Sequence, residues 1–512
     1  MVVVGAGSAG CVLAARLSED AERSVLLLEA GPPDDPVEVR LPSAFYQLFR
    51  TERDWDLSTE PQPALAGRRL AWPRGRMLGG SSSMNAMIYI RGAAADYDGW
   101  GIPGWTYRDL LPYFLRAEDN ARGASAYHAT GGPLRVEDLR RRHRLTQAFL
   151  DSAAAAGLPA NPDFNGAAQD GVGPYQVTQR GGRRWSAADG YLRPALSRPN
   201  LTVRTDARVA GVLVAGGRAT GVAYTLAGQD RVATAGEVVL AAGAVHSPQL
   251  LMLSGIGPAA ALEALDLPVH ADLPVGEGLQ DHPCIPQSWF TRPGVADLRD
   301  AETPANVLRW LAGHRGPLSS NVAEVGGFVR TVPGPAPDLQ LLAMPAVVVD
   351  HGRAQLPAGV TIAPTVVHVH SRGRLTLRSA DPRWAPVVDA GYYTDPRDLA
   401  AAVAGVRLAH EIAATGPLAD LIDRPYGTGD PERAVREATE TLYHPVGTCA
   451  LGPVVDPALR VHGIAGLRVA DAAVLPSVPR GNTNAPTIAL AERAADLLRG
   501  RVPAPLIAGA DA

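Results

Sequence analysis

The chain of 512 residues contains no lysine; all 48 of its basic residues are arginine. Arginine does not readily release its proton, so no side chain here can act as a Schiff-base lysine, a P-loop lysine or a lysine general base. Pyridoxal-phosphate enzymes and P-loop kinases are therefore excluded by composition. The chain also has no G-x-S-x-G segment, so it lacks the nucleophile turn of the α/β-hydrolases.

Cysteine is scarce and charge is nearly balanced. The three cysteines, Cys11, Cys284 and Cys449, are far apart and form no C-x-x-C pair, which favours a reducing compartment over a disulfide framework. The net charge of −4 gives no sign of a nucleic-acid partner. No apolar run reaches the roughly 18 residues of a membrane span, and the N-terminus does not resemble a signal peptide. We therefore expect a cytoplasmic protein without a membrane span.

The chain begins with a strand–turn–helix–strand pattern that is typical of dinucleotide binding. Strands are predicted over residues 2–4 and 25–28, and a helix over residues 9–17. Gly5, Gly7 and Gly10 lie between the first strand and the helix, spaced as G-x-G-x-x-G. Such glycines allow a tight turn and the close approach of a pyrophosphate to a helix N-terminus, and Glu29, 19 residues after Gly10, is placed to reach ribose hydroxyls. The pattern predicts a dinucleotide site but does not decide between NAD and FAD.

Further strand–turn–helix pieces lie at both ends of the chain, around a β-rich middle. They comprise a Gly/Ser-rich loop (74–92), helices from Tyr107 and over 146–157 and 395–415, a hairpin within 200–240, and strand–turn–helix units at 236–257 and at 466–500, the last helix starting at about Pro486. Between 285 and 375, the runs "GGFVR", "DLQLLAM", "TIAPTVVHVH" and "GRLTLRS" predict one antiparallel sheet. We therefore expect an α/β fold (α+β overall). In it, a discontinuous Rossmann-like nucleotide domain (1–130, 186–280 and 445–512) is interrupted by a β-sheet-based substrate domain (131–185 and 281–444).

Five motifs in order resemble those of the glucose-methanol-choline (GMC) flavin oxidoreductases, closest to the branch similar to choline and alcohol dehydrogenases. They read "VVVGAGSAG…LLLEAG", "GRMLGGSSSMN", "GAVHSPQLLMLSGIG", "YHPVGTC" and "LRVADAAVLPSVPRGNTNAPTIALAE". The resemblance covers nearly the whole chain, from Val2 to about Arg499.

The resemblance implies that the dinucleotide is FAD. The residues it assigns to FAD are Gly5, Gly7, Ser8 and Gly10 at the pyrophosphate, Glu29 at the adenosine ribose, Val209 at the adenine, Gly79, Gly80, Ser83 and Asn85 along the flavin and its phosphates, and Asp471, Asn482 and Thr483 at the ribityl chain and ring. Some relatives attach the flavin covalently to a histidine just before the asparagine of the "GGSS" loop. That place holds Met84 here, and a thioether is poorly suited to the linkage, so we expect non-covalent FAD.

The resemblance further implies oxidation of a primary alcohol to an aldehyde by hydride transfer to flavin N5. Such a reaction needs a base at the hydroxyl group and a second group that holds its oxygen. The motifs supply His444 as the base and Asn482 as its partner; Asn482 cannot titrate, and Asn484 is a less favoured alternative. Oxygen or a quinone or other electron carrier would reoxidise the flavin, and the protein would be a monomer or a homodimer.

The remaining polar residues are expected to have other roles. His246 and His282 lie in family motifs but are assigned to packing, as are His128, His368, His370 and His462. His368 and His370 would form a strand pair without a third ligand, so no metal site is expected. Glu324 would either meet a cationic substrate such as choline or belong to the core. Relatives that cleave cyanohydrins or decarboxylate fatty acids in light share the flavin motifs, so both activities remain alternatives.

Overall fold

The computed structural model describes residues 1–501, and its first principal sheet is parallel, with the strand order β26–β13–β1–β2–β9. The strands are β1 (Val2–Val4), β2 (Val25–Leu28), β9 (Leu201–Arg204), β13 (Val238–Leu240) and β26 (Leu467–Val469). Valine and leucine dominate these strands because both faces of a parallel sheet are covered. The strands therefore come from three distant parts of the sequence.

Helices cover this sheet, and two of the three begin within four residues of a strand end. These are α1 (Ser8–Leu17), which follows β1, α7 (Gly243–Leu253), which follows β13, and α13 (Asn484–Leu498), which packs against α1 and α4 (Tyr107–Ala117). The helices begin at Ser8 and Asn484, one and two residues earlier than predicted. The predicted hairpin is present as β10 (Ala207–Ala215) and β11 (Arg218–Leu226), extended by β12 (Gln229–Thr234). Its turn residues Gly216 and Gly217 have φ of +56° and +71°, as a two-residue hairpin turn requires.

The second principal sheet has eight strands and is antiparallel. They are β7 (Gly171–Pro174), β17 (Pro283–Cys284), β18 (Gln287–Thr291), β19 (Val325–Val329), β20 (Leu339–Met344), β21 (Gly359–Val366), β24 (Ile422–Tyr426) and β25 (Glu440–Thr441). Helices α5 (Arg144–Ala155) and α10 (Pro396–Ala413) pack on it, and the latter matches the long helix predicted over 395–415. The mixed fold class is confirmed, whereas the predicted domain boundaries stay predictions.

Shorter elements connect these layers. The strands are β3 (Leu57–Ser58), β4 (Ala71–Trp72), β5 (Glu118–Asn120), β6 (Leu134–Asp138), β8 (Gln176–Val177), β14 (Ile256–Gly257) and β15 (Ala271–Asp272). The helices are α2 (Val37–Arg40), α3 (Ala94–Asp98), α6 (Arg193–Ala195), α8 (Ala259–Glu263), α9 (Pro304–Gly313), α11 (Gly416–Leu421) and α12 (Pro431–Ala438). Among the described residues, no helix combines the length and the apolar character needed to cross a bilayer.

Two expectations about the β-rich middle are wrong. The run "GRLTLRS" does not join the large sheet: β22 (Gly373–Thr376) pairs with β16 (Glu277–Leu279) and β23 (Val387–Asp389) in a separate three-stranded sheet. The pair His368 and His370 is not on a strand, because β21 already ends at Val366. Both errors have one cause: a β-like run indicates strand propensity, but its length and partner are decided by packing against other elements.

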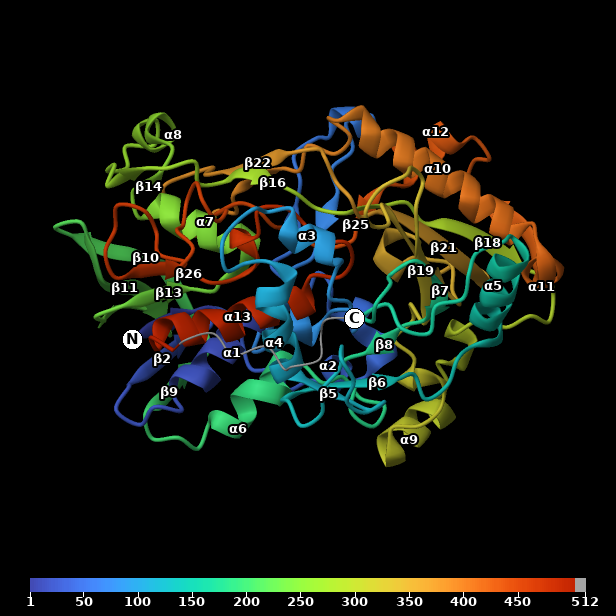
Figure 1. The fold of residues 1–512 in the computed structure, drawn as a ribbon, viewed down its shortest axis with the longest axis horizontal. Coiled ribbons are helices and arrows are strands. Elements are labelled where there is room, and N and C mark those ends of the chain that lie inside the picture. The colour runs from blue at the N-terminus through green and yellow to red at the C-terminus, as the bar shows by residue number, and fades with distance from the viewer. Residues whose placement is uncertain (502–512) are drawn as a thin grey trace.

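The parallel sheet lies at the left and the antiparallel sheet at the right of Figure 1, with α4 between them and α13 beside α1 in the half that holds the parallel sheet. The chain crosses from one sheet to the other several times, so residues far apart in sequence meet between them. The strand β25 at the edge of the large sheet leads to residues 442–448, and the loop after β26 leads to α13. The functional site lies where these two segments meet.

Candidate active site

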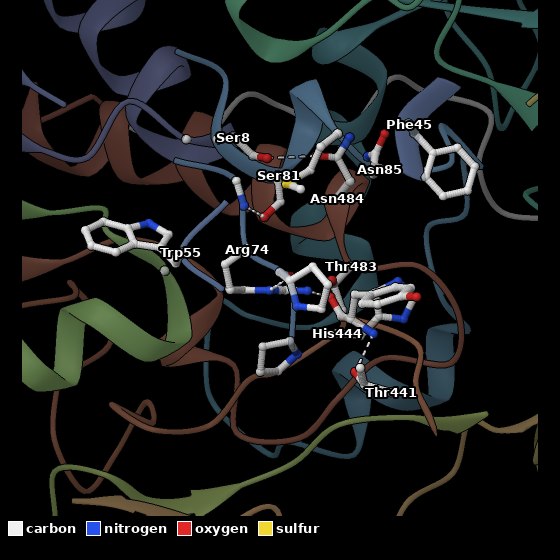
Figure 2. A pocket seen from close by; sticks show the side chains of 18 of the residues that line it. Ser8, Phe45, Trp55, Arg74, Ser81, Asn85, Thr441, His444, Thr483 and Asn484 are labelled. Atoms are coloured by element: carbon white, nitrogen blue, oxygen red, sulfur yellow. Dashed lines mark hydrogen bonds between the residues drawn. The ribbon is translucent and has the colours of Figure 1, made fainter. Parts of the chain in front are cut away.

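One elongated cavity extends from the glycine turn after β1 to the edge of the antiparallel sheet. Its wall includes Gly7, Glu29 and Val209 towards one end, and His444 and Asn482 towards the other. Figure 2 shows Ser8 and Asn484 joined by a hydrogen bond, with Trp55 and Phe45 on opposite sides of the view. The cavity thus connects residues that are far apart in the sequence, such as Ser8 and Asn484, which are 476 positions apart.

At each of the three glycines of the turn, an added Cβ atom would meet different surroundings. Gly5 has φ of +95°, and a Cβ there would lie 2.7 Å from the carbonyl oxygen of Ala241. A Cβ on Gly10 would lie 1.8 Å from the Gly5 carbonyl oxygen, so helix and turn touch there. A Cβ on Gly7, in contrast, would meet no protein atom within 4 Å, although Gly7 lies on the cavity wall. The protein therefore leaves room beside Gly7, as the approach of a pyrophosphate requires.

Glu29 follows β2 at the same end of the cavity. Its Oε2 accepts from the backbone N–H of Ala6 (2.8 Å) and its Oε1 from that of Gly31 (2.9 Å). Burial nevertheless raises the pKa of Glu29 to about 7. Each carboxylate oxygen has a second lone pair, so Glu29 can still accept from a ligand hydroxyl; the ribose contact stays a prediction.

The Gly/Ser-rich loop crosses the glycine turn closely. Gly80 has φ of +51°, and a Cβ there would lie 2.7 Å from the Cα of Gly7. Gly80, Met84 and Asn85 lie on the cavity wall, whereas Gly10, Gly79 and Ser83 do not. The Ser83 hydroxyl donates to the carbonyl of Leu78 (2.8 Å), and the Asn85 Oδ1 accepts from Arg184 (2.7 Å). Ser83 is therefore placed to shape the loop rather than to touch a ligand.

Asp471 joins the two loops that follow β26 and β13. Its Oδ2 accepts from the N–H of Gly243 (2.8 Å) and from the Ser247 hydroxyl (2.6 Å), and its Oδ1 accepts from the N–H of Ala473 (2.8 Å). Asp471 and Thr483 both lie on the cavity wall. These bonds fix the edge of the parallel sheet where its strand ends converge, the usual place for a ligand in such sheets.

A strained turn brings His444 into the cavity. Tyr443 has φ of +67°, an uncommon conformation for a bulky residue. Its carbonyl accepts from Arg74 Nη2 (2.7 Å), and its N–H donates to the Thr441 hydroxyl (2.7 Å). The N–H of His444 donates to Asp281 Oδ1 (2.7 Å), and Asp281 Oδ2 accepts from the same Thr441 hydroxyl. The surrounding bonds thus hold the strained backbone in place.

Both ring nitrogens of His444 have partners. Its Nδ1 lies 2.9 Å from Nδ1 of His282, and its Nε2 lies 3.3 Å from Nδ2 of Asn482. Burial, followed by the nearby His282 and Arg74, lowers the pKa of His444 well below its usual value. Burial also lowers the pKa of His282 to about 3. Both imidazoles are therefore neutral near pH 7, and a hydrogen bond between the two Nδ1 atoms requires that one of them carries a hydrogen and the other accepts it.

Of the two asparagines considered as the partner of the base, Asn482 is the one that contacts the His444 ring. The Asn482 Oδ1 is buried and has no hydrogen-bond partner among the described residues. Asn484 lies elsewhere on the wall, and its Oδ1 accepts from the Ser8 hydroxyl (2.8 Å). An unpaired buried amide oxygen beside a cavity is costly, which indicates that a ligand completes its hydrogen bonding.

Glu324 does not lie on the cavity wall. Its carboxylate accepts from the N–H of His143 (2.7 Å) and from the hydroxyls of Thr146 and Ser320 (2.6 Å each), and it is 1% exposed. Of the two roles that the sequence left open for Glu324, these contacts support the one in the core.

Other residues, to which the sequence analysis gave no role in the site, contact His444 or line the cavity. His282 was assigned to packing, although its ring is the direct partner of the His444 ring. Trp55 stacks on His246 with ring centroids 3.9 Å apart, and Arg208 lies over the same indole at 5.5 Å; all three line the cavity near Val209. The "LQDHP" segment was a usable signal for His282, because it was already recognised as a family motif. Trp55 gave no comparable signal.

These features fit FAD. The wall provides open space beside Gly7, polar groups at both ends and an unpaired amide oxygen at Asn482. Gly5, Gly7 and Ser8 are placed for a pyrophosphate, Glu29 and Val209 for an adenosine, and Asn85, Asp471 and Thr483 for the flavin half of the molecule. These individual contacts stay predictions.

Comparisons with known proteins agree with this picture. The family model of the GMC oxidoreductase N-terminal region matches residues 1–284, and that of the C-terminal region matches residues 369–491. Mouse mitochondrial choline dehydrogenase is 43% identical (98% of this chain, 89% of the relative), and the alcohol dehydrogenase [acceptor] of Pseudomonas putida is 41% identical (98% and 96%). The chloroplastic fatty acid photodecarboxylase of Chlamydomonas reinhardtii is also 41% identical (98% and 90%).

Solved structures agree with the sequence comparisons. The crystal structure of pyridoxine 4-oxidase from Mesorbium loti superposes with a TM-score of 0.89 at 31% identity, covering 98% of this chain and 99% of that one. With the family models and the relatives, this similarity covers both principal sheets and the cavity between them. The chain therefore belongs to the GMC oxidoreductase family and is an FAD-dependent enzyme that acts on CH–OH donors.

Proposed function

We propose that the protein oxidises a primary alcohol to an aldehyde, with His444 as the general base. The observation that carries this proposal is the pair His444 Nε2 and Asn482 Nδ2, which lie 3.3 Å apart on the cavity wall. FAD, when bound, accepts the hydride that the alcohol carbon gives up. The chain itself supplies the group that takes the hydroxyl proton and the group that holds the oxygen.

The protonation state of His444 suits a base. A base must offer a lone pair at the pH of the reaction, and burial keeps this imidazole neutral. When Nδ1–H of His444 donates to Nδ1 of His282, the Nε2 lone pair is left facing Asn482 and the cavity. His282 then acts as a positioning residue, because it selects the tautomer in which Nε2 can accept a proton.

Asn482 suits the complementary role. Its Nδ2 is close enough to Nε2 of His444 for both atoms to reach one hydroxyl oxygen. The amide N–H would donate to that oxygen while Nε2 accepts its proton, so the developing negative charge is met by a donor. Asn482 does not change charge in the process, which leaves His444 as the only titrating member of the pair.

His444→Ala tests the proposal in steady-state kinetics with a benzylic or an aliphatic alcohol. Loss of a general base should lower kcat by roughly 10²–10⁴-fold. FAD binding should persist, because His444 is not among the residues assigned to the cofactor. His270→Ala is the matched control, since His270 is exposed and does not line the cavity. Undiminished turnover of His444→Ala would reject the assignment.

Two other reactions, cyanohydrin cleavage and light-driven decarboxylation, are the alternatives to alcohol oxidation. Anaerobic mixing with an alcohol should bleach the flavin absorbance in the dark. A failure to bleach with any alcohol, combined with release of benzaldehyde from mandelonitrile, would assign a lyase instead. Decarboxylation of a fatty acid only under blue light would assign a photodecarboxylase. Repeating the alcohol assay with oxygen and with a quinone analogue separates the two classes of acceptor.

A further inference from the structure

A short helix beside the cavity opening exposes apolar side chains. Helix α9 (Pro304–Gly313) leaves Val307 39%, Leu308 66% and Leu311 54% exposed. In Figure 1 it projects from the lower edge of the β-rich half of the molecule. Its inner face is anchored by Trp310, which is buried and whose Nε1 donates to the carbonyl of Gly182 (2.9 Å). The helix is therefore fixed to the body while its outer face has no protein partner among the described residues.

Exposed arginines lie on this helix, just after it, and in a segment that contacts its C-terminal end. They are Arg140, Arg141, Arg142 and Arg144 in the segment that leads into α5, and Arg309 and Arg315 on and after α9. The two segments touch, since Nη1 of Arg140 donates to the carbonyl of His314 (3.3 Å). None of the six arginines forms an ion pair within residues 1–501.

Acidic groups offset only part of this positive charge. Two exposed carboxylates, Asp300 and Glu302, lie just before α9, and neither forms an ion pair with the six arginines among residues 1–501. Oδ2 of Asp300 accepts from the N–H of Asp297 (3.0 Å), and Oε1 of Glu302 accepts from the Tyr46 hydroxyl (2.9 Å). Many other exposed arginines of this chain do pair with carboxylates, as Arg383 does with Asp381 and Arg433 with Glu437. The cluster thus combines positive charge with apolar side chains, as in proteins that bind to membrane surfaces.

The surface adjoins the cavity. Glu302 is exposed, lies on the cavity wall together with Tyr46 and Leu298, and precedes α9 by only two residues. Phe45 and Phe49 line the same part of the wall. A flat partner seated on α9 would therefore lie next to the opening through which an apolar molecule reaches the site.

We propose that α9 and the six arginines form a docking surface for an anionic lipid bilayer. Leu308 and Leu311 enter the headgroup region, and the arginines meet lipid phosphates and carboxylates. The surface belongs to a peripheral protein, consistent with the lack of any described helix able to cross a bilayer. Where the proposed alcohol oxidation holds, docking delivers membrane-dissolved apolar alcohols or quinones to the cavity; the docking itself does not depend on that reaction.

Vesicle co-sedimentation of the FAD-loaded protein tests the docking. The full chain should sediment with phosphatidylglycerol-containing vesicles at low salt, remain in solution with neutral phosphatidylcholine vesicles, and be released at high salt as the charges are screened. Arg141→Gln, Arg142→Gln and Arg315→Gln combined should weaken binding roughly a hundredfold, at about fivefold for each arginine. None of these three side chains forms a hydrogen bond that the fold needs.

Matched controls separate the surface from general effects of charge or polarity. Arg383→Gln, Arg397→Gln and Arg433→Gln remove the same charge from exposed sites of other segments and should retain binding. Leu308→Ser with Leu311→Ser should weaken binding at least tenfold, whereas Val232→Ser, at a 61% exposed site on β12, should not.

Three results would overturn the proposal: no binding to anionic vesicles, binding unchanged in both sets of α9-surface variants, or concentration-dependent dimerisation that Leu308→Ser with Leu311→Ser abolishes. The last would assign the face to a second copy of the chain. Turnover with a soluble acceptor is measured in parallel. Normal turnover without vesicle binding rejects only the docking, and vesicle binding without alcohol turnover rejects only the proposed reaction.

Discussion

Replacing Gly7 with alanine separates ligand binding from folding. Gly7 has φ of −74° and ψ of −163°, which alanine adopts without strain. The added Cβ would meet no protein atom within 4 Å. The methyl group would instead occupy the space in which we expect the pyrophosphate to lie.

The expected magnitudes follow from that geometry. The unfolding free energy of the FAD-free protein should change by no more than about 1 kcal/mol, and the sign is expected to be stabilising, because alanine has fewer unfolded conformations than glycine. The affinity for FAD should fall at least tenfold, about 1.4 kcal/mol, since backbone contact with the pyrophosphate is lost. Gly10→Ala provides the contrast. Its Cβ would lie 1.8 Å from the Gly5 carbonyl oxygen, so we expect a loss of roughly 1–3 kcal/mol or more in stability.

Two measurements on the same samples decide the outcome. Urea unfolding of the FAD-free proteins gives the stability, and quenching of flavin fluorescence on titration gives the affinity for FAD. Gly7→Ala with unchanged affinity would refute the assignment of the open space to the pyrophosphate. Gly7→Ala with strongly reduced stability would refute the conclusion that no protein atom lies there.

Three further outcomes are expected. Acid precipitation should leave the yellow colour in the supernatant, since Met84 lines the cavity where a covalent link would form; colour in the pellet would contradict this. Because the pKa of His444 lies well below 6.5, kcat/KM should be constant from pH 8 to 6.5 and fall only in more acidic buffer as Nε2 becomes protonated, whereas an inflection above pH 7 would contradict the base assignment. Asn482→Ala should lower kcat by roughly 10²-fold, in line with the loss of one donor to a developing oxyanion. Its stability should fall by no more than about 1 kcal/mol, because the Asn482 Oδ1 has no partner to lose and Nδ2 makes one long contact, 3.3 Å, with His444 Nε2; turnover equal to the parent would remove Asn482 from the mechanism.

The sequence by itself determined the local backbone structure at the N-terminus. Buried valines, three glycines at fixed spacing and a distal Glu29 predict a strand, a turn and a helix that must follow one another, and the structure contains them within one residue of their predicted bounds. The same holds for the Gly216–Gly217 hairpin, where both residues need positive φ. Such features depend on neighbours in the chain, so sequence spacing is enough to predict them.

Tertiary structure alone decided which distant groups meet. The partner of the His444 ring is His282, which is 162 residues away in the sequence. From its sequence motif, His282 was expected to have only a packing role. Glu324 was a candidate for the cavity, yet three donors hold it in the core: the N–H of His143 just before α5, the Thr146 hydroxyl in α5 and the Ser320 hydroxyl before β19. The run "GRLTLRS" joined a different sheet from its neighbours. In each case the outcome depends on which surfaces the folded layers bring together, and burial then decides whether a polar side chain is paired, unpaired or facing a ligand. The residue types that carry the chemistry can therefore be recognised from the sequence. Their distances, tautomers and pKa values depend on the fold, because they are set only when the two sheets enclose the cavity between them.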